Sequence, residues 1–317
     1  MKKVLVTETV HPAGLKMLED AGYEVIKSQI KDLRDGETLT REMADVDAAL
    51  IRIAEVPREA IEGAKNLKII ANHGVGIDNY PLDALKEKGI RLTTAPGANS
   101  RSVAEFVMGL MLAVTLQIKQ SADNYIKEGW AARSTTPMGY SLEGKTLSII
   151  GYGRIGRIIG DMAMNGFGMK VVVYDPYVPR NDERVTYVDD VDDALKAGDY
   201  VTLHLALTDD TRHMINDHAF QIMKKTAILI NCARGPIVDE EALVRALQND
   251  EIWGAGIDAT EVEPLDPESY LFKHPRTIVT PHFAIKTNET EEAVCTICAK
   301  NIIDFFEGNE LFGEIKL

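Results

Sequence analysis

Short apolar runs rich in β-branched residues alternate with longer amphipathic stretches along almost the whole chain. The runs predict buried strands, and stretches between them, such as 11–21 and 81–88, have the spacing of helices. Because strands alternate with helices, we expect parallel sheets joined by right-handed crossovers. The predicted strands are 4–7, 24–26, 49–52, 67–71 and 91–94 in the first third, and 146–151, 171–175, 200–204, 227–231, 256–258 and 277–280 in the remainder.

The grouping of these runs predicts two domains. About eleven strands in two sets indicate an α/β protein with two doubly wound, Rossmann-like parallel sheets. Residues 95–100, rich in Pro, Gly and Asn, mark a loop between the sets. From Ser102 to Glu105 a capping box predicts the start of a long apolar helix that reaches about Ile118.

The end of the chain predicts a discontinuous first domain. A long helical pattern covers 289–307, and no strand pattern follows it. The simplest topology returns this helix to the first sheet. We therefore expect one domain from residues 1–97 and 286–317, and a second from residues 98–285.

Composition and charge limit the kinds of molecule that this protein can be expected to bind. The 317 residues have a formal net charge of −14, which argues against binding nucleic acid through phosphates. No apolar run reaches the ~20 residues of a membrane span, and the N-terminus is interpreted as a strand rather than a signal peptide. Three cysteines give no even disulfide framework, so we expect a protein of the reducing cytoplasm.

A glycine-rich turn provides the first candidate chemistry. Gly151, Gly153 and Gly156 form a GxGxxG between a predicted strand and helix. The first glycine permits a tight turn, the second lets a pyrophosphate approach the backbone, and the third lets helix and strand pack closely. Asp175 ends the next strand, 19 residues after Gly156. Its carboxylate suits ribose hydroxyls and would repel a 2′-phosphate, so NAD is the predicted cofactor. Arg154 and Ile155 complete the turn.

Several separated motifs resemble, in order, those of the D-2-hydroxyacid dehydrogenase family, over nearly the whole chain. That family includes phosphoglycerate, glycerate, D-lactate and hydroxypyruvate/glyoxylate enzymes. The matching segments are 74–79, 102–105, 151–156, 203–204, 231–235, 258–264 and 280–282. The resemblance implies that residues 1–97 with 286–317 bind substrate and that residues 98–285 bind NAD.

The activity implied by this resemblance is NAD-dependent hydride transfer between a D-2-hydroxy acid and its 2-keto acid. A phosphoglycerate dehydrogenase-like or a hydroxypyruvate/glyoxylate reductase-like enzyme is favoured. The alternatives are a D-lactate-type dehydrogenase and a dinucleotide-sensing, corepressor-like binding protein. A relative of formate dehydrogenase is disfavoured, because those enzymes typically carry Gln where this chain has Glu263.

The resemblance also implies a catalytic set, namely Arg234, Glu263 and His282. An imidazole can give a proton to a carbonyl oxygen and take it back in the reverse direction. A neighbouring carboxylate would stabilise the protonated ring, and a forked guanidinium can bind the substrate carboxylate. Glu261 is a rival for the carboxylate role, but the family's Glu directly precedes a Pro, which favours Glu263.

Further contacts follow from the same resemblance. The expected cofactor contacts beyond the glycine turn and Asp175 are His204, Leu205, Ala206, Thr211, Cys232, Ala233 and Asp258. The expected substrate contacts are Arg52, Val75, Gly76 and Asn99. Asp258 could instead be a buried structural residue.

Three positions depart from the family pattern. Ala206 stands where the family often has Pro, which loosens that loop. Ile53 stands where a Ser often follows the Arg, and Asn72 replaces an Arg common before the Gly74 loop. One polar substrate contact is therefore missing, and specificity for a phosphate is in doubt.

Other signals are weaker. Cys295 and Cys298 form a CxxC inside a predicted helix, where packing is the expected role, and no metal site is predicted. His73 could touch substrate. Trp130 is expected in a loop after the long apolar helix, and that helix with its loop predicts a homodimer.

Overall fold

The computed structural model describes residues 1–30 and 32–317. The chain divides into two compact units: unit 1 holds Met1–Asn99 and Lys286–Leu317, and unit 2 holds Ser100–Ile285. Each unit is built around its own sheet. The predicted fold class, two parallel-sheet α/β domains of which the first is discontinuous, is confirmed.

The sheet of unit 1 has the strand order β13-β5-β4-β3-β1-β2. Its strands are β1 (Lys3–Val6), β2 (Glu24–Lys27), β3 (Ala48–Ile51), β4 (Ile69–Asn72), β5 (Arg91–Thr93) and β13 (Glu314–Ile315). The first five run parallel, whereas β13 pairs antiparallel with β5. The prediction that no strand follows the last helix is wrong, because β13 lies after it. A two-residue strand is too short to leave an alternating pattern.

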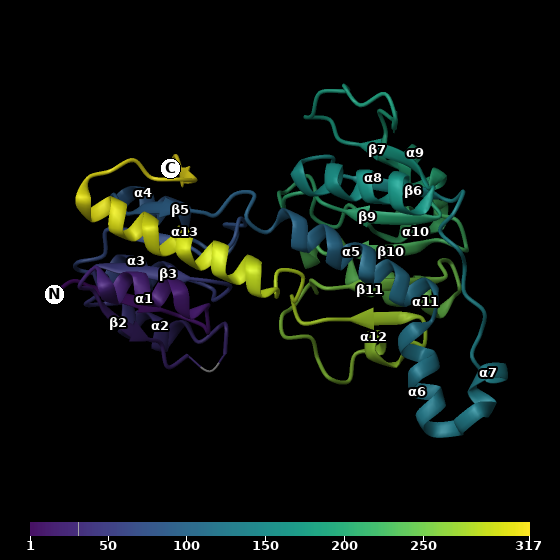
Figure 1. Cartoon of the computed structure of the whole chain (residues 1–317), viewed down its shortest axis with the longest axis horizontal. Coiled ribbons are helices and arrows are strands. Elements are labelled where there is room, and N and C mark those ends of the chain that lie inside the picture. Colours follow the sequence, from purple (N-terminus) through teal and green to yellow (C-terminus); the bar gives the residue numbers. More distant parts are fainter. Residues whose placement is uncertain (31) are drawn as a thin grey trace. The chain divides into compact units, whose positions relative to one another are not determined.

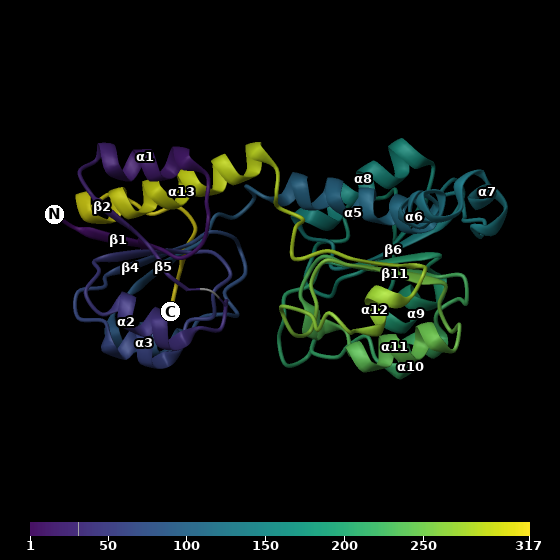
Figure 2. The same cartoon turned by 90° about the horizontal axis from the view of Figure 1, so that it is seen from below.

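Helices cover both faces of that sheet. They are α1 (Pro12–Asp20), α2 (Gly36–Met43), α3 (Arg58–Gly63), α4 (Leu82–Lys88) and α13 (Asn288–Glu307). Figure 2 shows α1 and α13 on one face and α2 and α3 on the other. As expected, α13 returns to the first sheet, where it packs on α1, β3 and β4. Cys295 and Cys298 are buried in this packing, as their spacing predicted.

The sheet of unit 2 has the strand order β12-β11-β10-β9-β6-β7-β8, all parallel (Figure 1). The strands are β6 (Thr146–Ile150), β7 (Lys170–Tyr174), β8 (Thr186–Tyr187), β9 (Tyr200–Leu203), β10 (Ile228–Asn231), β11 (Gly254–Ile257) and β12 (Thr277–Val279). β6 and β9 are neighbours at the point where the strand order reverses. In doubly wound sheets, dinucleotides bind outside the carboxyl ends of the strands at that point.

The helices of unit 2 also form two layers around its sheet. In Figure 2, α5 and α8 lie on one side, and α9 to α12 lie on the other. The helices are α5 (Ser100–Thr115), α6 (Ile118–Glu128), α7 (Ala132–Thr135), α8 (Arg154–Phe167), α9 (Val191–Ala197), α10 (Asp217–Ile222), α11 (Glu240–Gln248) and α12 (Tyr270–Lys273), with short 3-10 turns η1 (Gly129–Ala131) and η2 (Gly235–Ile237).

Two details of the long apolar helix differ from expectation. α5 begins at Ser100, so Ser102 lies in its first turn and is not its N-cap, and Glu105 pairs with Arg101. The helix also breaks before Ile118, because Gln117 has a left-handed backbone with φ of 55°. Trp130 therefore lies in η1 and not in a loop directly after one long helix.

No single helix in the described part of the chain is long and apolar enough to cross a membrane. The segments Ser100–Thr115 and Ile118–Thr135, which are bent against each other, have the length and composition of a membrane span only when they are counted together.

Candidate active site

The glycine turn joins β6 to α8, and its backbone explains each glycine. Gly151 has φ of +99°, and a Cβ there would lie 2.6 Å from the carbonyl oxygen of His204. A Cβ on Gly156 would lie 2.3 Å from the carbonyl oxygen of Gly151. A Cβ on Gly153, in contrast, would meet nothing within 4 Å. The turn therefore leaves open space in front of the N-terminus of α8, whose unpaired N–H groups suit a pyrophosphate.

Asp175 lies directly after β7, beside this turn. Its carboxylate accepts hydrogen bonds from the backbone N–H groups of Tyr152, at 2.7 Å, and Tyr177, at 2.9 Å. These bonds fix the carboxylate next to the glycine turn. A carboxylate has about four acceptor sites, so it retains capacity for the hydroxyl groups of a ribose.

The loop after β9 supplies the next group of expected cofactor contacts. The Nε2 of His204 lies 2.8 Å from Thr202 Oγ1, and burial lowers the pKa of His204 to about 3, so its ring is neutral at pH 7. Thr211 Oγ1 donates to the carbonyl oxygen of Ala206 at 2.7 Å and closes the loop without help from a proline. Leu205 lies between them and packs against the core of unit 2.

The ends of β10 and β11 position the remaining contacts. Cys232 and Ala233 follow β10, and burial raises the pKa of the Cys232 thiol well above its usual range. Asp258 follows β11 and is 2% exposed. Its carboxylate accepts from Thr280 Oγ1 at 2.6 Å and from the backbone of Phe283 and Ala284, so it anchors the segment that carries His282.

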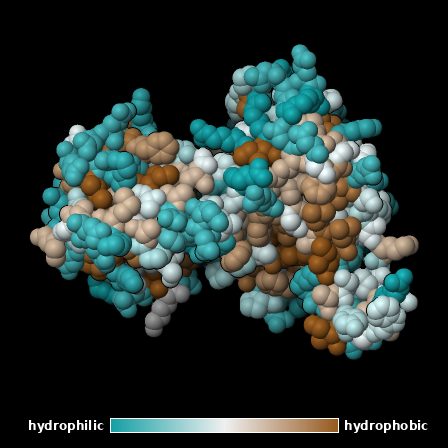
Figure 3. Space-filling view, in the orientation of Figure 1, coloured by the Kyte–Doolittle hydropathy of each residue, from teal (hydrophilic) through white to brown (hydrophobic). Residues whose placement is uncertain are grey.

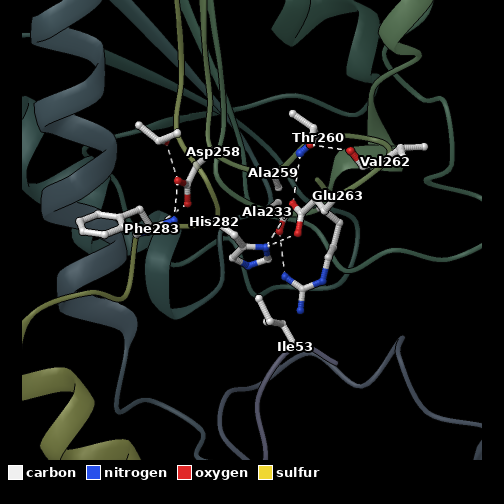
Figure 4. A network of polar contacts seen from close by, with 12 residues as sticks. Ile53, Ala233, Asp258, Ala259, Thr260, Val262, Glu263, His282 and Phe283 are labelled. Atoms are coloured by element: carbon white, nitrogen blue, oxygen red, sulfur yellow. Dashed lines mark hydrogen bonds and ion pairs between the residues drawn. The ribbon is translucent and has the colours of Figure 1, made fainter. Parts of the chain in front are cut away.

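His282 and Glu263 meet beside this anchor (Figure 4). The Nδ1 of His282 lies 3.1 Å from Glu263 Oε2 and 3.2 Å from Oε1. The backbone N–H of His282 donates to the carbonyl oxygen of Asp258 at 2.9 Å, and its φ is 50°. Both side chains stay about one-quarter exposed, at 25% and 28%, so the pair remains open to a substrate.

The rival carboxylate points elsewhere. Glu261 Oε1 lies 2.6 Å from His213 Nε2, and its other oxygen accepts from the backbone N–H of Glu240. The structure therefore brings Glu263, and not Glu261, to His282. Glu261 is thus the partner of His213.

Arg234 lies between β10 and η2, and two contacts hold its backbone next to the Glu263 segment. Asn231 Nδ2 donates to the carbonyl oxygens of Arg234, at 3.0 Å, and Ala259, at 3.4 Å. A Cβ on Gly235 would lie only 1.9 Å from the carbonyl oxygen of Thr260, so this position requires glycine. The guanidinium donates to the carbonyl oxygen of Ala233 at 2.8 Å and has further N–H donors.

The expected substrate residues lie in unit 1. Val75 and Gly76 follow β4; Val75 is 43% exposed, and Asn72 Nδ2 holds the carbonyl oxygen of Gly76 at 2.8 Å. Asn99 is half-buried at the end of the first segment of the unit. Arg52, however, is only 8% exposed.

Arg52 is paired within the protein. Its Nη2 lies 2.9 Å from Glu291 Oε1, in the first turn of α13. Glu291 could not be predicted as this partner, because nothing in the local pattern of α13 indicates a contact with a residue so far away along the chain. Among the described residues, no group of three or more His, Cys, Asp or Glu side chains is placed to hold a metal.

Comparison with known proteins identifies the family. The model of the D-isomer specific 2-hydroxyacid dehydrogenase, NAD binding domain, matches residues 108–284. The D-3-phosphoglycerate dehydrogenase of Methanocaldococcus jannaschii is 39% identical over 97% of this chain, which spans 58% of that relative. The glyoxylate reductase of Thermococcus litoralis is 36% identical over 96% of this chain and 94% of its own length.

A solved structure supports the same family assignment. An NADPH-dependent glyoxylate/hydroxypyruvate reductase from Sinorhizobium meliloti, in complex with NADP and malonate, has a TM-score of 0.88 at 28% identity, covering 99% of this chain and 96% of that one. The protein is an NAD(P)-dependent oxidoreductase. It belongs to the D-isomer specific 2-hydroxyacid dehydrogenase family.

Proposed function

We propose that the protein reduces a small 2-keto acid to its D-2-hydroxy acid, and catalyses the reverse reaction, with unit 2 binding NAD and unit 1 binding substrate. The observation that carries this proposal is the contact between His282 and Glu263, which makes an oriented proton donor. Hydroxypyruvate, glyoxylate and phosphohydroxypyruvate are the leading candidates. Relatives named glyoxylate reductase and phosphoglycerate dehydrogenase support both kinds of substrate.

Each catalytic residue has one task in this reaction. When bound, NADH supplies the hydride that adds to carbon 2 of the keto acid. His282 donates a proton to the carbonyl oxygen from Nε2, since Nδ1 faces Glu263. Glu263 accepts the hydrogen bond from Nδ1 and so orients the ring. Arg234 binds the substrate carboxylate and polarises the carbonyl group. In oxidation, His282 takes the proton back.

The remaining proposed contacts divide between the two molecules bound. Val75, Gly76 and Asn99 bind the substrate. The proposed NAD contacts are Gly151, Gly153, Arg154, Ile155, Gly156, Asp175, His204, Leu205, Ala206, Thr211, Cys232, Ala233 and Asp258. Because the carboxylate of Asp175 lies beside the glycine turn, we propose NAD rather than NADP as the physiological cofactor.

We also propose a cytoplasmic homodimer. Apolar side chains gather on the surface over α5 and the start of α6 (Figure 3), and Leu116 and Ile118 there are 50% and 52% exposed. Ile126 and Trp130 beyond them are 84% and 76% exposed. Such a patch favours burial against a second copy. Light scattering at micromolar concentration should give twice the mass of the chain, and a monomer would contradict the dimer.

One assay tests the enzymatic function. NADH oxidation is followed with hydroxypyruvate, glyoxylate, pyruvate and phosphohydroxypyruvate in turn, and turnover of at least one is expected. Tight NADH binding without turnover of any of the four would contradict the proposal and favour the dinucleotide-sensing alternative.

A further inference from the structure

The carboxyl edge of the unit 1 sheet is a natural place for a ligand. The order of its parallel strands, β5-β4-β3-β1-β2, reverses between β1 and β3. Doubly wound sheets bind ligands outside the strand ends at this point. Glu8 follows β1 there and Arg52 follows β3, so these two residues occupy the edge where a substrate would be expected.

Three successive backbone N–H groups at this edge already hold an anion, the carboxylate of Glu8. Arg52 N lies 3.1 Å from Glu8 Oε2, and the N atoms of Ile53 and Ala54 both lie 2.8 Å from Oε1. Thr7 Oγ1 also hydrogen-bonds to this carboxylate. Converging amides of this kind form an anion-binding concavity, such as those that bind phosphate. Here the chain fills that concavity itself.

The buried guanidinium of Arg52, at the same edge, is also paired with a carboxylate of the chain itself. Arg52 Nη2 lies 2.9 Å from Glu291 Oε1, and the exposed fractions of the two side chains are 6% and 11%. Lys286 Nζ lies 3.4 Å from the same oxygen. Arg52 Nη1 donates to the carbonyl oxygen of Thr9 at 3.4 Å. A second anion could use Arg52 only by separating a buried ion pair, which leaves a charge uncompensated.

His73 is a buried, neutral polar residue beside Glu291 at this edge. It follows β4 and is 1% exposed, and neither ring nitrogen has a hydrogen-bond partner among the described residues. Burial lowers its pKa to about 4, although Glu291 lies 3.9 Å from Nε2 and acts in the opposite direction. A neutral imidazole offers one donor and one acceptor, which match a hydroxyl group better than a phosphate.

We propose that Glu8 and Glu291 select the substrate by occupying both anion-binding groups at this edge, so that 2-keto acids with an uncharged remainder are used and phosphorylated ones are disfavoured. This inference rests on the proposed function. A phosphate group would have to displace a carboxylate or lie against it, and like charges in contact are unfavourable. Hydroxypyruvate and phosphohydroxypyruvate are matched probes, because they differ only in the phosphate.

The test compares kcat/KM for these two acids, with NADH, in the unmodified protein, Glu291→Gln and Glu289→Gln. Glu289 is the matched control, since it lies in the same first turn of α13 but is exposed. The unmodified protein should favour hydroxypyruvate. Glu291→Gln should raise the ratio of kcat/KM for phosphohydroxypyruvate to kcat/KM for hydroxypyruvate about tenfold. This is the effect expected when the phosphate gains one charged hydrogen bond. Glu289→Gln should leave the ratio unchanged.

Two results would overturn the inference while the proposed function stands. One is a preference of the unmodified protein for phosphohydroxypyruvate. The other is an unchanged ratio in a Glu291→Gln protein that melts like the parent. If Glu291→Gln does not fold, Arg52→Gln provides the test through the same ratio of kcat/KM values. An unchanged ratio supports the inference that Glu291 keeps Arg52 from binding phosphate, and a tenfold fall overturns that inference. Turnover of neither acid would contradict the proposed function, and this inference with it.

Discussion

The Nδ1 of His282 lies 3.1 Å from Glu263 Oε2, and Glu263 Oε1 also accepts from the backbone N–H of Thr260 at 3.3 Å. The carboxylate is thus held by its own loop while it holds the imidazole. A hydrogen bond at Nδ1 sets the tautomer and orientation of the ring, so Nε2 is the atom left for a substrate.

His282→Ala should lower kcat strongly and leave NADH affinity nearly intact, because the imidazole is proposed to touch the carbonyl oxygen and not the dinucleotide. Loss of a positioned proton donor costs about 10²- to 10⁴-fold. Steady-state kinetics and NADH fluorescence titration measure the two effects. A kcat within about threefold of the parent would assign proton transfer to another group.

Glu263→Gln should lower kcat for the reduction by about tenfold, a smaller loss than that of His282→Ala. The amide oxygen can still accept the hydrogen bond from Nδ1, but the carboxylate that lies 3.1 Å from the ring and orients it is lost. Glu261→Gln is the matched control, because Glu261 contacts His213 and Glu240 instead. A loss of kcat in the control with none in Glu263→Gln would show that the carboxylate is misassigned.

Asp175→Ser combined with Pro176→Arg should change the preference between cofactors. The carboxylate that repels a 2′-phosphate is removed, and a cation is added beside it. The ratio of kcat/KM for NADPH to that for NADH should rise by about tenfold or more. An unmodified protein that already prefers NADPH would contradict the role given to Asp175.

Gly235→Ala should destabilise the protein and reduce activity, because its Cβ would collide with the carbonyl oxygen of Thr260 and displace Arg234. Overpacking of this kind costs about 1–3 kcal/mol. Gly166→Ala is the control: a Cβ there meets nothing within 4 Å in α8, and alanine should add about 1 kcal/mol of stability. Denaturant melts measure both. Equal stability of the two variants would argue against the close packing at Gly235.

His274 should make the protein sensitive to mild acid. Burial lowers its pKa to about 4, and it is 5% exposed. Below pH 6.5, His274 is therefore protonated in the unfolded state but remains neutral in the folded state. The free energy of unfolding falls as the pH falls toward 4. The contribution of His274 should be about 2 kcal/mol between pH 7 and pH 5.

His274→Asn tests this, since an amide oxygen can replace Nδ1 as the partner of Thr277. The variant should lose less stability over the same pH range in urea melts. Identical pH dependence of variant and parent would show that His274 is protonated in the folded state as easily as in the unfolded one.

The local pattern determined much of this protein. The strand, the glycine turn and the helix from Thr146 to Phe167 follow from short-range requirements: β-branched residues, a positive φ at Gly151 and a close approach at Gly156. The same reasoning predicted two parallel sheets and the return of α13 to the first of them. Such features depend on neighbouring residues and on general rules of connection, which a sequence displays directly.

Only the tertiary structure decided which side chains meet. Glu261 and Glu263 lie two residues apart on one loop, and the path of that loop alone directs Glu263 to His282 and Glu261 to His213. Arg52 indicated an anion-binding residue, yet Glu291, far along the chain, neutralises it. The break at Gln117 and the two-residue β13 were likewise invisible, because a single backbone angle or a short edge pairing leaves no periodic pattern. The periodic pattern of apolar residues indicates which side chains are buried, whereas packing between distant segments decides which side chains contact one another.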